Sequence, residues 1–288
     1  MAEFVIHPDV ENYIVEVEWP DIRDGDDSLR RQLVSWFEDG KLILLKNHGL
    51  DIDYELLNSF ELPHSENLRK LPYNRLLYPK LWKADQRRAI FGSFGMNAPK
   101  YFRVRNEIKR VNASLQKRTR DVFRDYRFLR EQYSWRLLNT PETTHTLHID
   151  FHSGGDMHYA RFFLNIDSEP RVWEVSHRLD EVVRRFHDEL DWRELNKLSA
   201  DQFYTMVGNH LRKRGGAPCH QASFQQGDLW LCDTRTISHG VLSGHRMVAT
   251  HFWVDPQSMD EPSKRVESRV ANFRKTFGAQ AGVVEAAT

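Results

Sequence analysis

From Tyr133 onward the chain consists of short β-rich runs separated by turn residues, and this pattern limits its possible folds more than any other feature. The runs are rich in branched and aromatic residues, and turns such as Gly154-Gly155 divide them. They fall in two batches around a helical insertion at about 180–214. The predicted strands are Ser134–Leu138, Thr144–His152, His158–Ile166, Val172–Val175, Ala222–Phe224, Leu229–Cys232, Gly240–Leu242 and Met247–Val254.

The rest of the chain mixes both kinds of element. Tyr13–Trp19 and Lys41–Lys46 predict strands, Asp26 or Asp27 to Phe37 predicts a helix, and about Ala84–Arg130 is helical in pattern, with Asn106–Phe128 as its longest segment. Many short strands backed by helices favour a mainly β fold with helical support (α+β) on a double-stranded β-helix core of the cupin or jelly-roll type. We expect one catalytic domain over 1–288, with an α/β support at 1–133, the core at 134–255, and a C-terminal helix and tail at 256–288.

Bulk composition excludes several classes of protein. Of the 288 residues 40% are hydrophobic, which is ample for a packed core and argues against disorder. The two cysteines, Cys219 and Cys232, are not in a CxxC arrangement, which excludes a disulfide framework and a thiolate zinc site. The N-terminus does not resemble a signal peptide, and no apolar run approaches the roughly 20 residues that span a bilayer. These features predict a cytoplasmic protein.

The run Leu147-His148-Ile149-Asp150-Phe151 is the clearest chemical motif. Side chains two residues apart on a strand point to the same face, so His148 and Asp150 project together. They would supply two of the three ligands of a facial triad for iron(II), which needs a second imidazole. An isolated His-x-Asp is common by chance, and His152, on the same face, is a competing ligand.

His239 supplies the second imidazole, 89 residues after Asp150. It follows a turn and a buried strand at Gln226–Cys232, and a short strand that ends in a turn continues from it. This order places a distal histidine beside the first pair in cupin-type barrels. We therefore predict His148, Asp150 and His239 as the catalytic metal ligands, with three coordination positions left for a 2-oxoacid and dioxygen.

A 2-oxoglutarate co-substrate needs a cation for its distal carboxylate, preferably a guanidinium. The positions about ten residues after His239, around Thr250, hold none that qualifies. Arg161 lies in an aromatic strand, where an unpaired charge is costly to bury, and is the first candidate. Arg246 is the second, and Asn165 and Thr250 are further candidates for cofactor binding. The alternative for Arg161 is a structural ion pair with a protein carboxylate.

Several runs carry a resemblance to a known family. They are Ser134-Trp135-Arg136, Arg161–Ile166, Glu169–Val175, the helix with Phe203-Tyr204 and His210, and His239–Gly244. Over most of residues 130–260 the sequence resembles the Kdo (3-deoxy-D-manno-oct-2-ulosonic acid) hydroxylases, as a divergent member. Those enzymes are iron(II)/2-oxoglutarate dioxygenases that hydroxylate Kdo in bacterial lipopolysaccharide. The resemblance implies iron(II), 2-oxoglutarate and O2 as cofactors, ascorbate as an in vitro reductant, and matching roles for His148, Asp150, His239 and Arg161.

One loop departs from the family pattern. Residues 137–144 form a longer and largely uncharged segment before His148, at the expected mouth of the active site. The first prediction is therefore a hydroxylase of an unactivated C–H bond in a Kdo-type anionic sugar, with the substrate open to revision. The alternatives are the same chemistry on a free amino acid or natural-product intermediate, and a metal-binding cupin without catalytic activity.

A basic stretch lies upstream of the core. Residues 100–130 hold eleven Lys and Arg against three acidic residues, although the whole chain has a formal net charge of zero. Such a stretch can dock a glycolipid substrate at the inner membrane, or a nucleic acid backbone. No recognised nucleic-acid module accompanies it. The alternative is a solvated helix face whose charges pair with acidic residues elsewhere in the protein.

Overall fold

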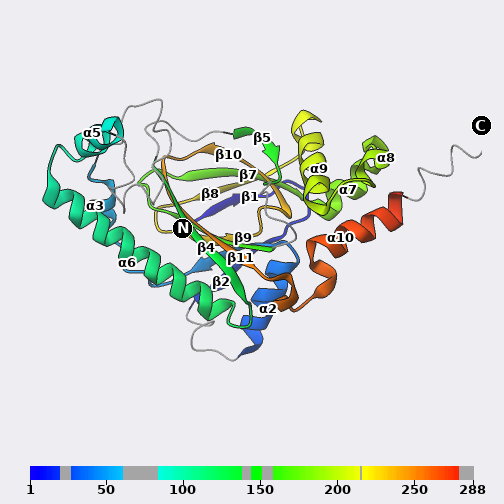
Figure 1. Ribbon diagram of the computed structural model, residues 1–288, viewed down its shortest axis with the longest axis horizontal. Helices are drawn as coiled ribbons and strands as arrows, with labels where there is room; N and C mark the ends of the chain where they lie inside the picture. The colour runs from blue at the N-terminus through cyan, green and yellow to red at the C-terminus, as the bar shows by residue number, and fades with distance from the viewer. Residues whose placement is uncertain (20–26, 61–83, 138–143, 151–157, 215, 279–288) are drawn as a thin grey trace, which may run out of the picture.

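The computed structural model describes residues 1–19, 27–60, 84–137, 144–150, 158–214 and 216–278. Within them, eleven strands form two sheets (Figure 1). One has the order β1-β8-β7-β10-β5 and the other the order β2-β3-β9-β6-β11-β4. The strands are β1 (Glu3–Val5), β2 (Ile14–Glu18), β3 (Leu42–Lys46), β4 (Phe128–Leu137), β5 (Thr144–His148), β6 (His158–Asn165), β7 (Arg171–Arg178), β8 (His220–Phe224), β9 (Leu229–Cys232), β10 (Ile237–Ser243) and β11 (Arg246–Val254).

The strand order is that of a jelly roll. β10 lies between β7 and β5 in one sheet, and β11 lies between β6 and β4 in the other. All pairs are antiparallel except β2 with β3. The last two strands thus insert between earlier ones, one in each sheet, as two interleaved Greek keys require. The predicted mainly β fold with a jelly-roll core is confirmed.

Aromatic side chains from both sheets fill the space between them. Phe163 and Trp230, from the six-stranded sheet, stack with ring centroids 5.4 Å apart. Phe224, from the five-stranded sheet, stacks on the same indole at 3.8 Å, and Trp173 meets it edge-on at 5.4 Å. These rings are buried with aliphatic residues of both sheets, so one part of the barrel interior is solid core.

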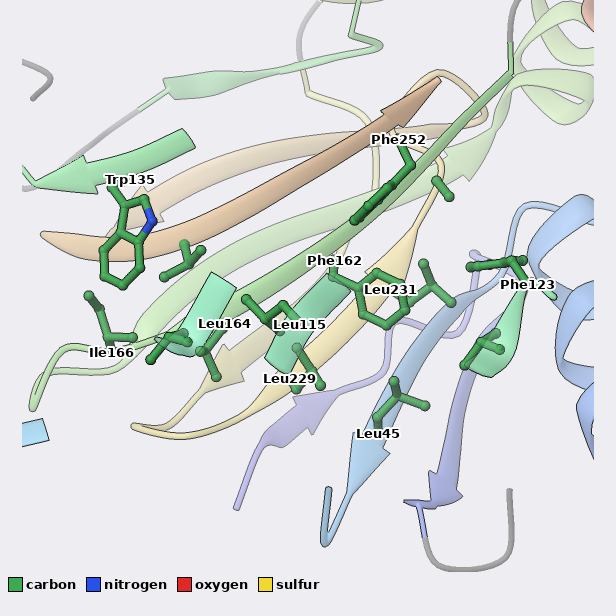
Figure 2. Close-up of a cluster of buried hydrophobic side chains, with 14 of the residues drawn as sticks. Leu45, Leu115, Phe123, Trp135, Phe162, Leu164, Ile166, Leu229, Leu231 and Phe252 are labelled. Carbon is green, nitrogen blue, oxygen red and sulfur yellow. The ribbon is translucent and has the colours of Figure 1, made fainter. Parts of the chain in front are cut away.

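The outer face of the six-stranded sheet is covered by α6 (Ala98–Val122), which runs along it in Figure 1. Its buried residues Val104, Ile108, Val111 and Leu115 recur at intervals of three and four, which is the spacing of a single helix face. Figure 2 shows Leu115 among side chains of β6 and β9. Other helices on the N-terminal side are α2 (Asp27–Glu38), α3 (Tyr54–Asn58) and α5 (Ala84–Ser93).

A second group of helices packs against β5, and its member α9 lies beside that strand in Figure 1. Leu147 and Ile149 are buried in it, on the opposite face of their segment from His148 and Asp150. The group comprises α7 (Leu179–Phe186), η3 (His187–Glu189), α8 (Trp192–Leu195), α9 (Ala200–Arg214) and α10 (Val266–Phe273), and η4 (Pro256–Ser258), η5 (Pro262–Lys264) and η6 (Arg274–Gly278) flank α10.

The structure corrects the predicted helix at Asn106–Phe128. The helix ends at Val122, and β4 already begins at Phe128. The rings of Phe123 and Tyr126 stack at 4.9 Å in the intervening turn, and Phe128 packs on Phe252 of β11 at 5.4 Å. Tertiary packing against β11 therefore overrides the helical pattern of this stretch.

Candidate metal centre

The three predicted ligands converge on adjacent strands of the five-stranded sheet. His148 is the last residue of β5, Asp150 follows two residues on, and His239 lies on β10 directly opposite His148 in the register. The two imidazole centroids are 4.5 Å apart, and His148 Nε2 is 3.5 Å from Asp150 Oδ1. One ligating atom from each of the three residues lies within 4.8 Å of the others. Two nitrogens and one carboxylate oxygen suit iron(II) bound from one side.

Neighbouring groups hold the three side chains in place. The Asp150 amide donates to Thr234 O at 2.9 Å, which ties the end of the His-x-Asp segment to the turn before β10. The His239 ring stacks on Trp173 at 5.2 Å, and its Nδ1 lies 3.1 Å from Ile237 O. With Nδ1 donating to that carbonyl, Nε2 keeps its lone pair for a metal.

The electrostatics favour the metal-binding protonation states. Burial lowers the pKa of His239 to about 4, against a smaller opposing effect of Asp150. Burial alone would raise the pKa of Asp150, but the Arg161 guanidinium and the two imidazoles outweigh it and hold that pKa well below its ordinary value. At neutral pH the site therefore presents a neutral His239 and an ionised Asp150, and a metal has no proton to displace from either.

Arg161 reaches the site from the six-stranded sheet. Its side chain is 2% exposed, and Nη1 contacts both Asp150 Oδ2 and Thr234 Oγ1. Nη2 lies 3.1 Å from Nε2 of His251, and Nε has no hydrogen-bond partner among the described residues. The ion pair with a protein carboxylate, which was the alternative for this arginine, is present, and its partner is one of the predicted metal ligands.

The other three candidates for cofactor binding are placed elsewhere. Arg246 donates to the Leu57 and Phe60 carbonyls, at 2.9 and 2.8 Å. On β11 it lies five residues from His251, about 17 Å along a strand, and faces the other side of the sheet. Thr250 shares that outer face, and its hydroxyl engages the backbone of Phe162.

Asn165 points inward but has a structural role. Its amide donates to the Phe224 and Glu169 carbonyls, at 2.9 and 3.0 Å, and its oxygen accepts from the Asp167 amide. It lies four residues from Arg161 on the same strand, about 13 Å away. The strand period of two thus puts Arg246 and Thr250 on the opposite face of the sheet from Arg161, and the distance along β6 separates Asn165 from the predicted metal ligands. The competing ligand His152 lies outside the described residues.

Sequence reasoning missed the turn between β9 and β10. Asp233, Thr234, Arg235 and Thr236 are all buried, and they join a buried strand to the strand of the distal histidine. Thr234 contacts both Asp150 and Arg161, as given above. The signal in the sequence was a polar run directly after the apolar strand 229–232, where a solvated turn would be the ordinary interpretation.

Many charges of the basic stretch have partners within the protein. Arg110 pairs with Asp51 and Glu107 at 2.6 and 2.8 Å, and Arg120 pairs with Glu131 at 2.6 Å. These contacts agree with a solvated helix face that is neutralised by acidic neighbours, and peripheral membrane contact through residues 100–130 stays a prediction. None of the helices in the described part of the chain has the length and apolarity needed to cross a membrane.

Comparison with known proteins places the fold. No protein-family model and no curated protein matches the chain. Among solved structures, the apo form of the Kdo hydroxylase KdoO, described as a non-heme Fe(II) alphaketoglutarate dependent dioxygenase, has a TM-score of 0.59 at 16% identity, over 88% of this chain and 93% of that one. The complex of KdoO with alphaketoglutarate and Fe(III) has a TM-score of 0.59 at 15% sequence identity. Its complex with cobalt(II) has a TM-score of 0.60 at 14% identity, and both cover the same shares of the two chains. At these identities the likeness shows a shared fold.

Proposed function

We propose that this chain is an iron(II)/2-oxoglutarate-dependent dioxygenase that hydroxylates an unactivated C–H bond. The observation that carries the proposal is the convergence of His148, Asp150 and His239, with ligating atoms within 4.8 Å of one another. The shared fold with KdoO, which binds Fe(III) and alphaketoglutarate in one of its structures, supports the same reaction class.

The three side chains would hold the metal from one side and leave its opposite positions to ligands that are not protein. Iron(II), when bound with 2-oxoglutarate and O2, supplies the oxidising chemistry that places an oxygen atom in the C–H bond. Trp173 and the Ile237 carbonyl would fix the orientation of the His239 ring. The Thr234 carbonyl would do the same for the backbone of Asp150.

Arg161 is proposed as the cation for the distal carboxylate of 2-oxoglutarate. Its guanidinium is buried beside the metal ligands, and its Nε has no partner among the described residues. A guanidinium has five N–H donors, so it can bind a second carboxylate while Nη1 keeps Asp150 in place. His251, at 3.1 Å from Nη2, would supply a further polar contact.

The first substrate candidate is a Kdo-type anionic sugar of lipopolysaccharide, because the solved structures of this fold include a Kdo hydroxylase. A free amino acid or natural-product intermediate is the second candidate. The two are separated by offering each class to the iron-loaded protein with 2-oxoglutarate and O2. Mass spectrometry then shows which compound gains one oxygen atom.

Succinate release tests the reaction class directly. The protein with iron(II), 2-oxoglutarate, O2 and ascorbate is expected to form succinate slowly even without its primary substrate. His148→Ala and Asp150→Ala should each reduce this rate by more than about a hundredfold, because a ligand is lost. His210→Ala is the matched control, since that ring pairs with Glu189 on the surface of the helical group.

Two outcomes would contradict the proposal. Full succinate release by Asp150→Ala would refute the assignment of the metal site. A wild-type protein that binds iron tightly but forms no succinate would favour the non-catalytic metal-binding cupin.

A further inference from the structure

The inner face of β4 carries a row of polar side chains that the proposed metal and 2-oxoglutarate sites do not use. β4 is the edge strand of the six-stranded sheet and pairs only with β11 among the described strands. Its register with β11 is continuous from Leu137 opposite Arg246 to Arg130 opposite Trp253. Alternation along this regular stretch therefore assigns each side chain to one of two faces.

One face of β4 is turned toward α6. Trp135 is buried and donates from its indole nitrogen to Asn112 Oδ1 at 3.1 Å, and Glu131 binds Gln116 and Arg120 of the same helix. Figure 2 shows Trp135 on the same side of the sheet as Phe162 and Phe252. Arg130, Gln132, Ser134 and Arg136 therefore lie on the opposite face, the one that holds Arg161.

The register connects this face to the metal ligands. Gln132 lies opposite His251 on β11. His251 lies beside Arg161, and Arg161 contacts Asp150. Across the three strands β6, β11 and β4, these side chains run from the buried Arg161 to the exposed Gln132. Two residues further along the strands, Arg130 of β4 lies opposite Trp253 of β11, and Trp253 lies opposite Tyr159 of β6. Two strand spacings and two residues put the Cα of Arg130 about 12 Å from that of Arg161.

Arg130 is held in place, and its guanidinium makes no hydrogen bond or ion pair with the residues that the structure describes. Its guanidinium carbon lies 4.8 Å from the centre of the Trp253 ring, and Trp253 packs edge-on against Tyr159 at 5.6 Å. It makes no ion pair with any described carboxylate, in contrast to Arg120 and Arg127, which pair with Glu131 and Asp255. A guanidinium stacked on an indole keeps its edge free for a planar anion.

We infer that Arg130, supported by Trp253, binds an anionic group of the primary substrate, and that Gln132 and Ser134 bind its hydroxyl groups. The inference rests on the proposed oxygenase function and adds specificity-determining residues to it. The four inward positions of β4 include no carboxylate, so this face favours an anion. Gln132 is level with Arg161, and Ser134 lies one step further along β4, opposite Ala249. An amide and a hydroxyl that follow the guanidinium along one face suit a compound rich in hydroxyl groups, such as a sugar acid.

Binding measured without turnover tests this assignment. The holoprotein with iron(II) and 2-oxoglutarate, kept anaerobic, is titrated with the sugar acids Kdo and glucuronate and with the methyl ester of each. Binding is followed by calorimetry and by the visible absorption of the iron–2-oxoglutarate complex. The wild type should bind at least one acid at least about tenfold more tightly than its ester, because the ester lacks the charge.

Arg130→Gln should weaken binding of that acid by at least about tenfold and bring the acid and ester affinities close together. Arg130→Lys keeps the charge but loses the paired N–H geometry, so it should fall between the two. Arg103→Gln is the matched control, because Arg103 is exposed on α6, on the other side of the sheet. The ratio of its affinity for the acid to its affinity for the ester should equal that of the wild type.

Two results overturn the assignment and leave the oxygenase function intact. The first is an Arg130→Gln protein that still separates acid from ester as the wild type does. The second is a wild-type holoprotein that forms the iron–2-oxoglutarate complex but binds no acid more tightly than its ester. Failure to form that complex at all, seen before any sugar is added, overturns both the oxygenase function and the subsite.

Discussion

Arg161 is the residue on which the proposed chemistry depends most after the metal ligands themselves. It contacts Asp150 and Thr234 through Nη1 and lies beside His251. Arg161→Gln should raise the 2-oxoglutarate concentration for half-maximal succinate release by at least about tenfold, because a charge-assisted contact is lost. Arg246→Gln should leave that concentration unchanged, since Arg246 binds two carbonyls of the N-terminal region. The reverse result would move the 2-oxoglutarate site to β11.

The buried histidines predict how the stability of the metal-free protein depends on pH. Burial lowers the pKa values of His239 and His158 to about 4, against about 6.5 when unfolded. Between these values the unfolded chain binds more protons, so the free energy of unfolding should fall as the pH drops from about 6.5 to 4. Each group contributes a slope of at most about 1.4 kcal/mol per pH unit.

Urea unfolding at a series of pH values measures this slope. His158→Gln should reduce the slope, because one of the rings that takes up a proton on unfolding is gone, whatever the variant's stability at pH 7. An unchanged slope in that variant would show that His158 does not contribute.

At the scale of elements, the contact of α9 with residues 147–150 helps to set where His148 and Asp150, two of the proposed metal ligands, lie. A Cβ at Gly208 would be 3.4 Å from Ile149 O and 3.5 Å from Ile149 Cβ. Gly208→Ala should therefore fit, whereas the branched side chain of Gly208→Val should displace the segment and weaken iron binding by at least about tenfold. Gly92→Val in α5 is the matched control, because no atom of the described residues outside the local helix lies within 4 Å of a Cβ placed there. Equal iron affinities in the two valine variants would contradict the role of this contact.

Local pattern predicted some elements well and others poorly. β9 has the predicted bounds, Leu229–Cys232, because a short apolar run lies between Asp228 and Asp233. β1 was missed, because three residues carry too little pattern and their pairing with β8 comes from the far end of the chain. The start of β4 was missed for a similar reason: the packing of Phe128 on Phe252 joins residues that are distant in sequence.

At the scale of the whole molecule, the proposed metal ligands come from one sheet, and Arg161 and the inner face of β4 come from the other. The first part could be predicted, because a period of two places His148 beside Asp150 and the jelly-roll order brings His239 opposite. The second could not, because the contact of Arg161 with Asp150 and Thr234 depends on how the sheets face each other. The spacing of residues within single strands carries no information on how far a side chain of one sheet lies from a side chain of the other.

Metal binding should stabilise the whole fold. β5 is an edge strand, and its described pairs with β10 are interrupted by a register shift, so a metal shared by both strands adds a link at a weak point. Iron(II) at a hundred times its Kd should add about 2.7 kcal/mol and raise the Tm by about 5 °C. His239→Ala should lose this shift in anaerobic thermal scans. A shift retained in that variant would place the metal elsewhere.

The position of β4 at the rim of its sheet has an evolutionary consequence. A strand with a partner on one side alone can exchange its inward side chains without disturbing a second neighbour. His148 and His239, by contrast, lie on two paired strands of one sheet, which must keep their register. In the proposed function, oxidation chemistry and the choice of compound belong to separate parts of the barrel, so descendants of such an enzyme could acquire new substrates by changing alternate residues of a single strand.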